Sequence, residues 1–321
     1  MTSGLRHLAA ATCGFALALT ALASPIAAQA GQMPADIAAK LQELGRVIDP
    51  PKTAPLYAPL QEKEPYAAIK VERDISYGSH ERNRLDLFVP EATSPAPRPV
   101  LIFVHGGGFV RGDKRPPGSP FYDNVLVWAA RNGFVGVNMT YRLAPQAMWP
   151  AGAEDVGAAV RWVGKEIAAR GGDPGRVFLM GHSAGAVHVA SYVAHPQFHT
   201  DKGTGLAGAI LVSGLYDLTS NPASDAERAY FGTDAATYKE RSSLPGLLAG
   251  KLPLLATMAE LDPPPFVQQF NQLKDSSCSS PRGCIATYVL PQHSHISEAY
   301  SLNTPDTRLG DAILAFVKST N

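Results

Sequence analysis

The chain has 321 residues, a length that fits either one large α/β domain or two domains of about 150 residues each. Its formal charge is zero, with 28 Lys and Arg against 28 Asp and Glu, so its composition favours neither a nucleic-acid partner nor electrostatic attachment to a membrane. Because 45% of the residues are hydrophobic and only 17% are charged, the chain can bury a large core and is not predicted to be disordered.

Residues 1–30 have the pattern of a secretory signal peptide. Arg6 precedes an almost wholly apolar run over residues 8–23, and an A-Q-A site with small residues at 28 and 30 follows. That run is shorter than the ~20 residues that span a bilayer. We therefore expect cleavage after Ala30, or alternatively after Ala23, and a mature protein that is secreted or periplasmic and free of the membrane.

Residues 31–67 form a polar, Pro-containing lead-in to the main domain. Ile37, Leu41, Leu44 and Ile48 recur there at helical spacing, which predicts one short amphipathic helix. The lead-in is too short to fold alone, so we expect it to pack on the domain formed by residues 68–321.

From residue 68 onwards, short runs rich in β-branched residues alternate with helical stretches. The first two runs are separated by turn residues at 78–83, which predicts an antiparallel hairpin. The alternation after it predicts an α/β fold, with a mostly parallel eight-stranded sheet and helices on both of its faces. Residues 216–251, between two strands, are predicted to form a small cap. The expected strands cover residues 68–75, 84–88, 99–104, 134–140, 177–181, 208–213, 253–258 and 285–290.

Two glycine-rich motifs each follow a predicted strand. His105 is followed by three glycines, whose unshielded N–H groups can bind a developing oxyanion. A phosphate-binding turn is excluded because neither P-loop nor Rossmann spacing is present. The segment 181–185 reads G-H-S-A-G between a strand and a helix, the G-x-S-x-G pattern that presents a nucleophilic serine, here Ser183, on a sharp turn.

A serine nucleophile needs a base, and the base needs an orienting carboxylate. Glu260 and Asp262 follow one late strand, and His293 and His295 follow the next. Members of each pair are two residues apart, so strand parity cannot choose between them. The two histidines could also ligate a metal, but no carboxylate motif accompanies them.

Cysteine usage agrees with export. Beyond the signal only Cys278 and Cys284 remain, separated by Ser, Ser, Pro, Arg and Gly. These are turn residues, which can bring two cysteines within bridging distance, and an oxidising compartment favours the bond. We predict a disulfide, with two free thiols as the alternative.

Several motifs together are similar to the hormone-sensitive-lipase type and the bacterial feruloyl-esterase-like (BD-FAE-like) branch of the α/β-hydrolases. They are H-G-G-G at 105–108, Y-R-L-A-P at 141–145, G-H-S-A-G at 181–185 and A-E-L-D-P at 259–263. The resemblance implies an α/β-hydrolase fold. It also assigns the triad acid to Asp262, the base to His295, and the oxyanion donors to the amides of Gly107, Gly108 and Ala184, with His105 holding the loop.

The sequence therefore predicts an exported serine carboxylesterase acting on small to medium uncharged esters. The small-molecule ester is the expected partner, and the scheme requires no metal or organic cofactor. An arylformamidase with the same triad is the alternative enzyme, and a non-catalytic binding protein is the alternative of another class. Candidate pocket walls are Phe109, Trp149, Leu215, Tyr216 and Phe266.

Overall fold

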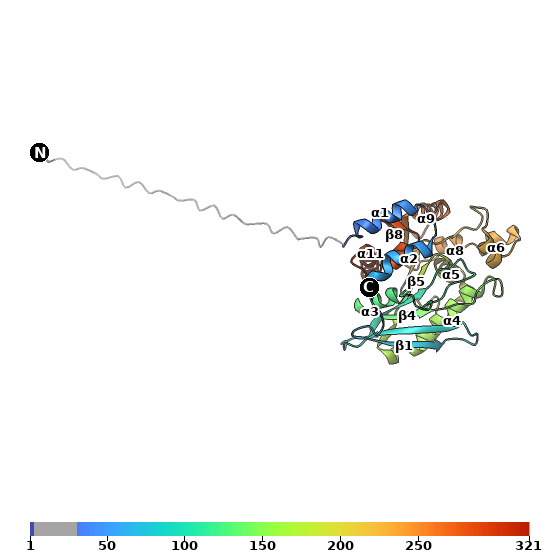
Figure 1. Ribbon diagram of the computed structural model, residues 1–321, viewed down its shortest axis with the longest axis horizontal. Helices are drawn as coiled ribbons and strands as arrows, with labels where there is room; N and C mark the ends of the chain where they lie inside the picture. Colours follow the sequence, from blue (N-terminus) through green and yellow to red (C-terminus); the bar gives the residue numbers. More distant parts are fainter. Residues whose placement is uncertain (3–30, 321) are drawn as a thin grey trace.

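The computed structural model describes residues 1–2 and 31–320; the predicted signal peptide lies outside them apart from its first two residues. A single sheet runs through the molecule in the order β1-β2-β4-β3-β5-β6-β7-β8, which confirms the predicted α/β fold (Figure 1). The strands are β1 (Ile69–Ser76), β2 (Arg84–Pro90), β3 (Arg98–Val104), β4 (Val135–Met139), β5 (Gly172–His182), β6 (Gly208–Val212), β7 (Leu254–Leu261) and β8 (Ala286–Ser294).

The directions of the strands determine which edge of the sheet can hold a site. β1 and β2 form the predicted antiparallel hairpin, with Ser76 opposite Arg84, and β2 is also antiparallel to β4. All remaining pairs are parallel. The carboxyl ends of β3, β5, β6, β7 and β8 therefore meet at one edge of the sheet, where ligands bind in open α/β sheets.

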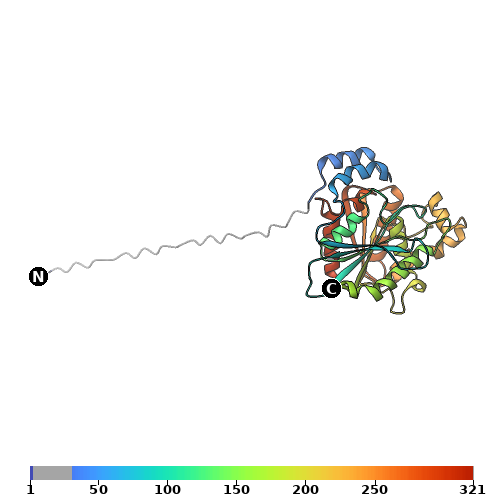
Figure 2. The same ribbon diagram turned by 60° about the horizontal axis from the view of Figure 1, so that its bottom comes forward.

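Helices cover both faces of the sheet, because alternate residues of the central strands are buried on opposite sides. In β3, Leu101 and Phe103 join one core cluster with α1, α3 and α11, whereas Val100 and Ile102 join another with α4 and α5. Figure 2 shows the blue lead-in helices and the green α4 on opposite sides of the sheet. Burial on both faces explains why these strands read as continuous apolar runs.

The helices follow the predicted alternation with the strands. Among the described residues, no helix is both long and apolar enough to cross a bilayer. The α-helices are α1 (Ala35–Leu44), α2 (Pro50–Tyr57), α3 (Asp123–Arg131), α4 (Ala151–Glu166), α5 (Ala184–Ala194), α6 (Asp225–Phe231), α7 (Tyr238–Arg241), α8 (Leu244–Ala249), α9 (Pro264–Cys278), α10 (Ser297–Tyr300) and α11 (Arg308–Ser319).

The lead-in contains two helices where one was predicted. Ile37 and Leu41 are buried on α1 as expected, but the helix ends at Leu44, where Gly45 adopts a φ of 72°. Ile48 therefore lies beyond the helix, and its predicted place on the helical face was wrong. The second helix, α2, begins after Asp49, whose side chain accepts a hydrogen bond from the Lys52 amide at 3.0 Å.

The segment between β6 and β7 contains α6, α7 and α8, and Figure 1 shows α6 at the periphery of the molecule. Tyr230 of α6 stacks on Phe109 of the glycine loop, with ring centroids 4.8 Å apart. Leu218 and Phe231 belong to the same small core cluster. The segment is thus packed directly against the loop that follows β3.

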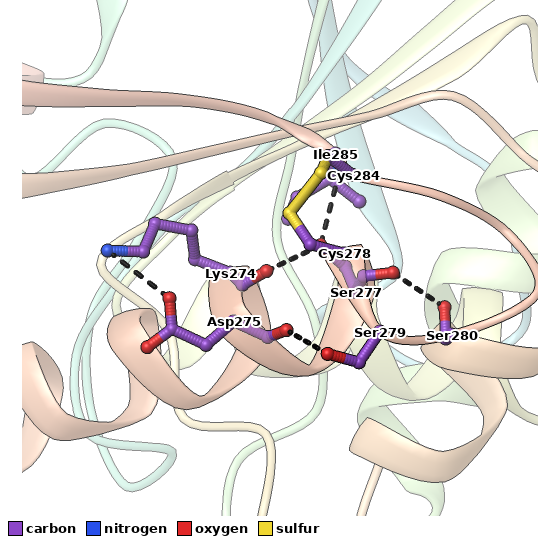
Figure 3. Close-up of a disulfide and its surroundings, with 8 residues drawn as sticks. All are labelled: Lys274, Asp275, Ser277, Cys278, Ser279, Ser280, Cys284 and Ile285. Carbon is purple, nitrogen blue, oxygen red and sulfur yellow. Dashed lines mark hydrogen bonds and ion pairs between the residues drawn. A yellow bond between two sulfur atoms is a disulfide. The ribbon is translucent and has the colours of Figure 1, made fainter.

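Cys278 and Cys284 form a disulfide that joins the end of α9 to the segment entering β8 (Figure 3). Beside it, the Ser277 hydroxyl accepts a hydrogen bond from the Ile285 amide at 3.2 Å. The bridge closes a short loop with a sequence separation of 6 residues.

We expect the double substitution Cys278→Ser and Cys284→Ser to lower the free energy of unfolding by about 2 kcal/mol, because closing a short loop restricts the unfolded chain. Urea unfolding measures this loss, and kcat should be unchanged. A variant as stable as the wild type would show that the bridge does not stabilise the fold.

Candidate active site

Ser183 occupies the sharp turn between β5 and α5. Its backbone has φ 56° and ψ −123°, a conformation that is strained for a residue with a side chain. The turn requires its flanking glycines, because a Cβ at Gly181 would lie 2.3 Å from the Gly185 carbonyl oxygen, and one at Gly185 would lie 2.1 Å from that of Val104. The Ser183 amide donates to the Val212 carbonyl at 2.9 Å, which fixes the turn to the neighbouring strand.

The glycine loop after β3 faces the same cavity as Ser183. Gly107 has a φ of 135°, and a Cβ there would lie 2.0 Å from the Arg111 carbonyl oxygen, so the loop has room only for glycine at this position. Gly107, Gly108 and Ala184 line that cavity together with Ser183. Residues from two segments that can supply backbone donors thus lie in one cavity with the hydroxyl, as an oxyanion site needs.

His105 holds this loop from beneath. Its Nδ1 donates to the Gly106 carbonyl at 2.6 Å, and its ring stacks on Tyr141 with centroids 4.4 Å apart. The Tyr141 hydroxyl donates to the His105 carbonyl at 3.0 Å. Burial lowers the pKa of His105 to about 4, so its ring is neutral at pH 7.

Asp262 and His295 form a fully buried pair at the ends of β7 and β8. Asp262 Oδ1 and His295 Nδ1 are 2.7 Å apart. Glu260, in contrast, is exposed and accepts a hydrogen bond from the Gln292 amide at 2.7 Å. The structure therefore brings Asp262, and not Glu260, to the histidine.

His293 has a different set of partners. Its Nε2 lies 3.0 Å from Asp306 Oδ2, and its Nδ1 lies 2.9 Å from the Ser297 hydroxyl. Arg308 completes this buried cluster by an ion pair with Asp306. Both ring nitrogens of His293 are thus engaged away from Asp262, so its surroundings are those of a structural residue.

The Asp262 contact also fixes the tautomer of His295. Because Nδ1 carries the hydrogen donated to the carboxylate, Nε2 is left with a lone pair. This Nε2 is buried and has no hydrogen-bond partner among the described residues. His182, next to Ser183, donates from its Nε2 to the His295 carbonyl at 2.7 Å, and this bond joins the serine turn to the histidine loop.

Two residues that sequence reasoning missed support the acid. The Ser213 hydroxyl, just beyond β6, contacts Asp262 Oδ2 at 2.5 Å and also bonds to Glu298 Oε1 on α10. The Ala259 amide donates to the same Asp262 oxygen at 2.9 Å. In the sequence, Glu298 stands out only as an acidic residue in an otherwise uncharged segment. That feature does not indicate which residues it contacts.

The cavity above Ser183 has a volume of about 820 Å³. Three predicted walls, Phe109, Leu215 and Phe266, line it. The lead-in and the cap segment complete its lining, since Ile48, Pro50, Pro51, Leu218 and Pro222 also face it.

The other two predicted walls, Trp149 and Tyr216, are not among the residues that line this cavity. The Trp149 ring instead packs edge-on against His195, with centroids 5.7 Å apart. Tyr216 is 1% exposed and belongs to the core beneath the sheet edge. Both predictions were wrong: the partly buried Trp149 packs beside the core, and Tyr216 fills it.

One group in the described chain has the composition of a metal site. Ligand atoms of His182, His295 and Glu298 lie within 4.8 Å of one another, and all three residues are buried. Each histidine already has one ring nitrogen engaged, with the His295 carbonyl and with Asp262 respectively. The hydrogen bonds that support the Asp262–His295 pair thus account for the proximity of the three residues.

Three buried histidines near the site are expected to lower the free energy of unfolding in acid. Burial lowers the pKa of His182 and of His188 to about 3, and that of His105 to about 4. An unfolded histidine titrates near ~6.5. Between these values the unfolded chain binds protons that the folded chain does not, so stability is complete above pH ~6.5 and falls as the pH falls.

We expect each of these histidines to lower the free energy of unfolding by about 1.4 kcal/mol per pH unit below pH ~6. Urea unfolding at pH 7 and pH 5 measures the slope, and His188→Phe should remove about a third of the contribution of these three histidines. Equal stability at both pH values would show that these rings take up protons in the folded protein.

The acid assignment gives a further prediction. Asp262→Asn should lower kcat by on the order of 10⁴, because an amide holds the imidazole in the wrong tautomer. Glu260→Gln is the matched control, and it should leave kcat within about threefold of the wild type because the exposed Glu260 side chain bonds to the Gln292 amide and not to His295. The reverse order of the two variants in steady-state kinetics would transfer the acid role to Glu260.

Comparisons with known proteins find similarity over part of the chain. The family model described as BD-FAE matches residues 85–210. The chain is 38% identical over 127 residues to a probable isoprenylcysteine alpha-carbonyl methylesterase, ICMEL2, of Arabidopsis thaliana, an alignment that covers 39% of this chain and 28% of the relative. It is 36% identical over 157 residues to esterase LipQ of Mycobacterium tuberculosis, covering 46% of this chain and 36% of the relative.

The fold has parallels among solved structures. The crystal structure of esterase B from Lactobacillus rhamnosis superposes with a TM-score of 0.70 over 89% of this chain and 95% of that chain, at 19% sequence identity. The matched region 85–210 contains both glycine motifs and Ser183. The chain is thus similar to the BD-FAE family over residues 85–210 and shares its fold with esterases of the α/β-hydrolase type, while it spans only about a third of the length of the relatives it matches.

Proposed function

We propose that the protein is an exported serine carboxylesterase that hydrolyses small to medium uncharged esters through an acyl-enzyme intermediate. One observation carries the proposal: Ser183, on its strained turn, shares a cavity with the amides of Gly107, Gly108 and Ala184. The buried Asp262–His295 pair ends at the same sheet edge. Relatives that carry esterase names support the reaction class.

In the proposed reaction, Ser183 Oγ forms a bond to the acyl carbon, and the carbonyl electrons move to oxygen. The three backbone amides bind that oxyanion. His295 Nε2 takes the hydroxyl proton and passes it to the alcohol as the ester C–O bond breaks, which leaves an acylated Ser183. A water molecule then repeats the sequence with His295 as base, and the carboxylic acid leaves.

The cavity supports the proposed substrate class. Phe109, Leu215, Leu218 and Phe266 give it apolar walls, which suit an uncharged acyl or alcohol group. Two of the acidic side chains in its lining are engaged with neighbours: Asp217 bonds to Thr219 and Ser220, and Glu227 bonds to Ser224. A volume of about 820 Å³ fits a ligand of small to medium size.

A series of nitrophenyl esters tests the activity. We expect the acetate, butyrate and octanoate to be hydrolysed with the highest kcat/KM among them, and the palmitate to be a poorer substrate, since the proposal is for esters of small to medium size. An aryl formamide, assayed in parallel, should react far more slowly. Turnover of the formamide without turnover of any ester would favour an arylformamidase instead.

Export is supported by the pattern of residues 1–30 and by the disulfide, since disulfides persist in oxidising compartments. Expression of the full chain with its own N-terminus tests it. The mature protein recovered outside the cytoplasm should begin at Gly31. A product that keeps Met1 and stays in the cytoplasm would contradict export.

A further inference from the structure

The Ser213 hydroxyl lies between two carboxyl groups. Its oxygen is 2.5 Å from Asp262 Oδ2 and is also hydrogen-bonded to Glu298 Oε1. A serine hydroxyl has one proton, so it donates to only one of these oxygens. The second contact is a hydrogen bond only if the other carboxyl group carries a proton and donates to Ser213.

The remaining contacts identify which carboxyl group is protonated. Asp262 accepts hydrogen bonds from the Ala259 amide at 2.9 Å and from the His295 ring at 2.7 Å, as an ionised carboxylate does. Glu298 is fully buried, and its Oε2 has no hydrogen-bond partner among residues 31–320. A charged oxygen left in that state would be very costly, so Glu298 is the neutral partner.

The groups that face Glu298 favour the same state. Asp262 and His295 lie on one side, His182 within 4.8 Å, and the ring of Tyr216 nearby. None of these is a permanent cation. Burial, followed by the charge of Asp262, raises the pKa of Glu298 well above its usual range, whereas the Ser213 hydroxyl lowers it by less. The nearby Thr257 hydroxyl has a still smaller lowering effect on this pKa, and it makes no hydrogen bond with Glu298 among the described residues.

We propose that Glu298 is a positioning residue of the active site, which as a neutral acid donates a hydrogen bond to Ser213, so that Ser213 in turn donates to Asp262. The proposal rests on the proposed function of Asp262 and His295. Together with the Ala259 amide, this chain of hydrogen bonds orients the carboxylate so that Oδ1 faces the His295 ring. Because Glu298 is neutral, Asp262 alone of these two carboxyl groups places a negative charge next to the base His295.

A pair of variants separates hydrogen-bond donation from packing. Glu298→Gln keeps a neutral donor toward Ser213, whereas Glu298→Met has similar length but no donor. We expect the methionine variant to lower kcat about 10- to 100-fold with KM within about twofold, and the glutamine variant to recover kcat to within about threefold. Rates are expressed per site titrated with a fluorophosphonate, so a misfolded fraction does not enter.

The pH profile of kcat/KM reports the charge of Glu298. If Glu298 is neutral, Glu298→Gln leaves the acid limb, which reports protonation of the base, within about 0.3 pH units of the wild type. If Glu298 is ionised, removing its charge destabilises the imidazolium, and the limb moves to lower pH by about one unit or more. That shift, or equal losses of kcat in the two variants, would overturn the proposal.

Infrared spectroscopy of the full mature protein at pH 7 tests the protonation state without any assay of activity. We expect a carbonyl stretch of a neutral carboxylic acid in the wild type and in Ser183→Ala, and its absence from Glu298→Gln. A wild type without the band, or a band that persists in Glu298→Gln, would contradict the proposal. A protein that hydrolyses no ester but shows the band would contradict the proposed function alone.

Discussion

Replacing Ser183 by Ala is expected to lower kcat for a nitrophenyl ester by on the order of 10⁶, the size of effect that follows loss of a serine nucleophile. Loss of the hydroxyl removes the acyl-enzyme route, while the amides of the glycine loop still bind the carbonyl oxygen. The fold should be unaffected, because an alanine side chain is smaller than that of serine and the turn is held by backbone bonds.

Ser191→Ala is the matched control for this variant. Ser191 lies on the same helix, α5, and its hydroxyl is 3.4 Å from that of Ser243. Its kcat should stay within about twofold of the wild type, since the hydroxyl contacts no group of the site. Residual turnover by Ser183→Ala within tenfold of the wild type would show that another group is the nucleophile.

His295→Ala is expected to reduce kcat by a similar factor, on the order of 10⁶, because His295 is the residue proposed to take the Ser183 proton. His293→Ala provides the comparison. It removes the contact with Asp306 at 3.0 Å and should lower the free energy of unfolding by about 1–3 kcal/mol, while kcat per titrated site stays within a few-fold. Kinetics and urea unfolding of both variants measure the contrast; the opposite ranking would move the base to His293.

The strands and both glycine motifs could be predicted from the sequence because each depends on local features. Residues 100–104 of β3, residues 177–180 of β5 and all of β6 are buried on both faces, so they appear as unbroken apolar runs. Gly107 and Gly181 occupy positions where a Cβ would collide with backbone atoms. Such requirements act on a few neighbouring residues and leave a recognisable pattern.

The acid and the base could not be chosen from residue order alone. The register between β7 and β8 shifts between Ala259 and Leu261, so the simple alternation of strand residues fails just before Asp262. Which carboxylate faces His295 is decided by that irregularity and by the Ala259 amide that binds Asp262. The family resemblance, and not the spacing, selected Asp262.

Ser213 and Glu298 illustrate contacts that a sequence does not display. They come from the end of β6 and from α10, 85 positions apart, and meet only because parallel strands end at one edge. Trp149 and Tyr216 were wrongly predicted as cavity walls, because an aromatic residue near a sheet edge has the same local pattern whether it lines a cavity or fills the core.

The helix α2 was missed because prolines usually interrupt helices, whereas two of its three prolines occupy its first positions.

Labelling with a fluorophosphonate tests the central claim most directly. The wild-type protein should gain the mass of one phosphonyl group per chain, the modified peptide should contain Ser183, and ester turnover should fall in proportion to labelling. Ser183→Ala should gain none. A folded wild-type protein that is not labelled, or is labelled at another residue while Ser183 stays free, would contradict the assignment of Ser183 as the nucleophile of a serine esterase.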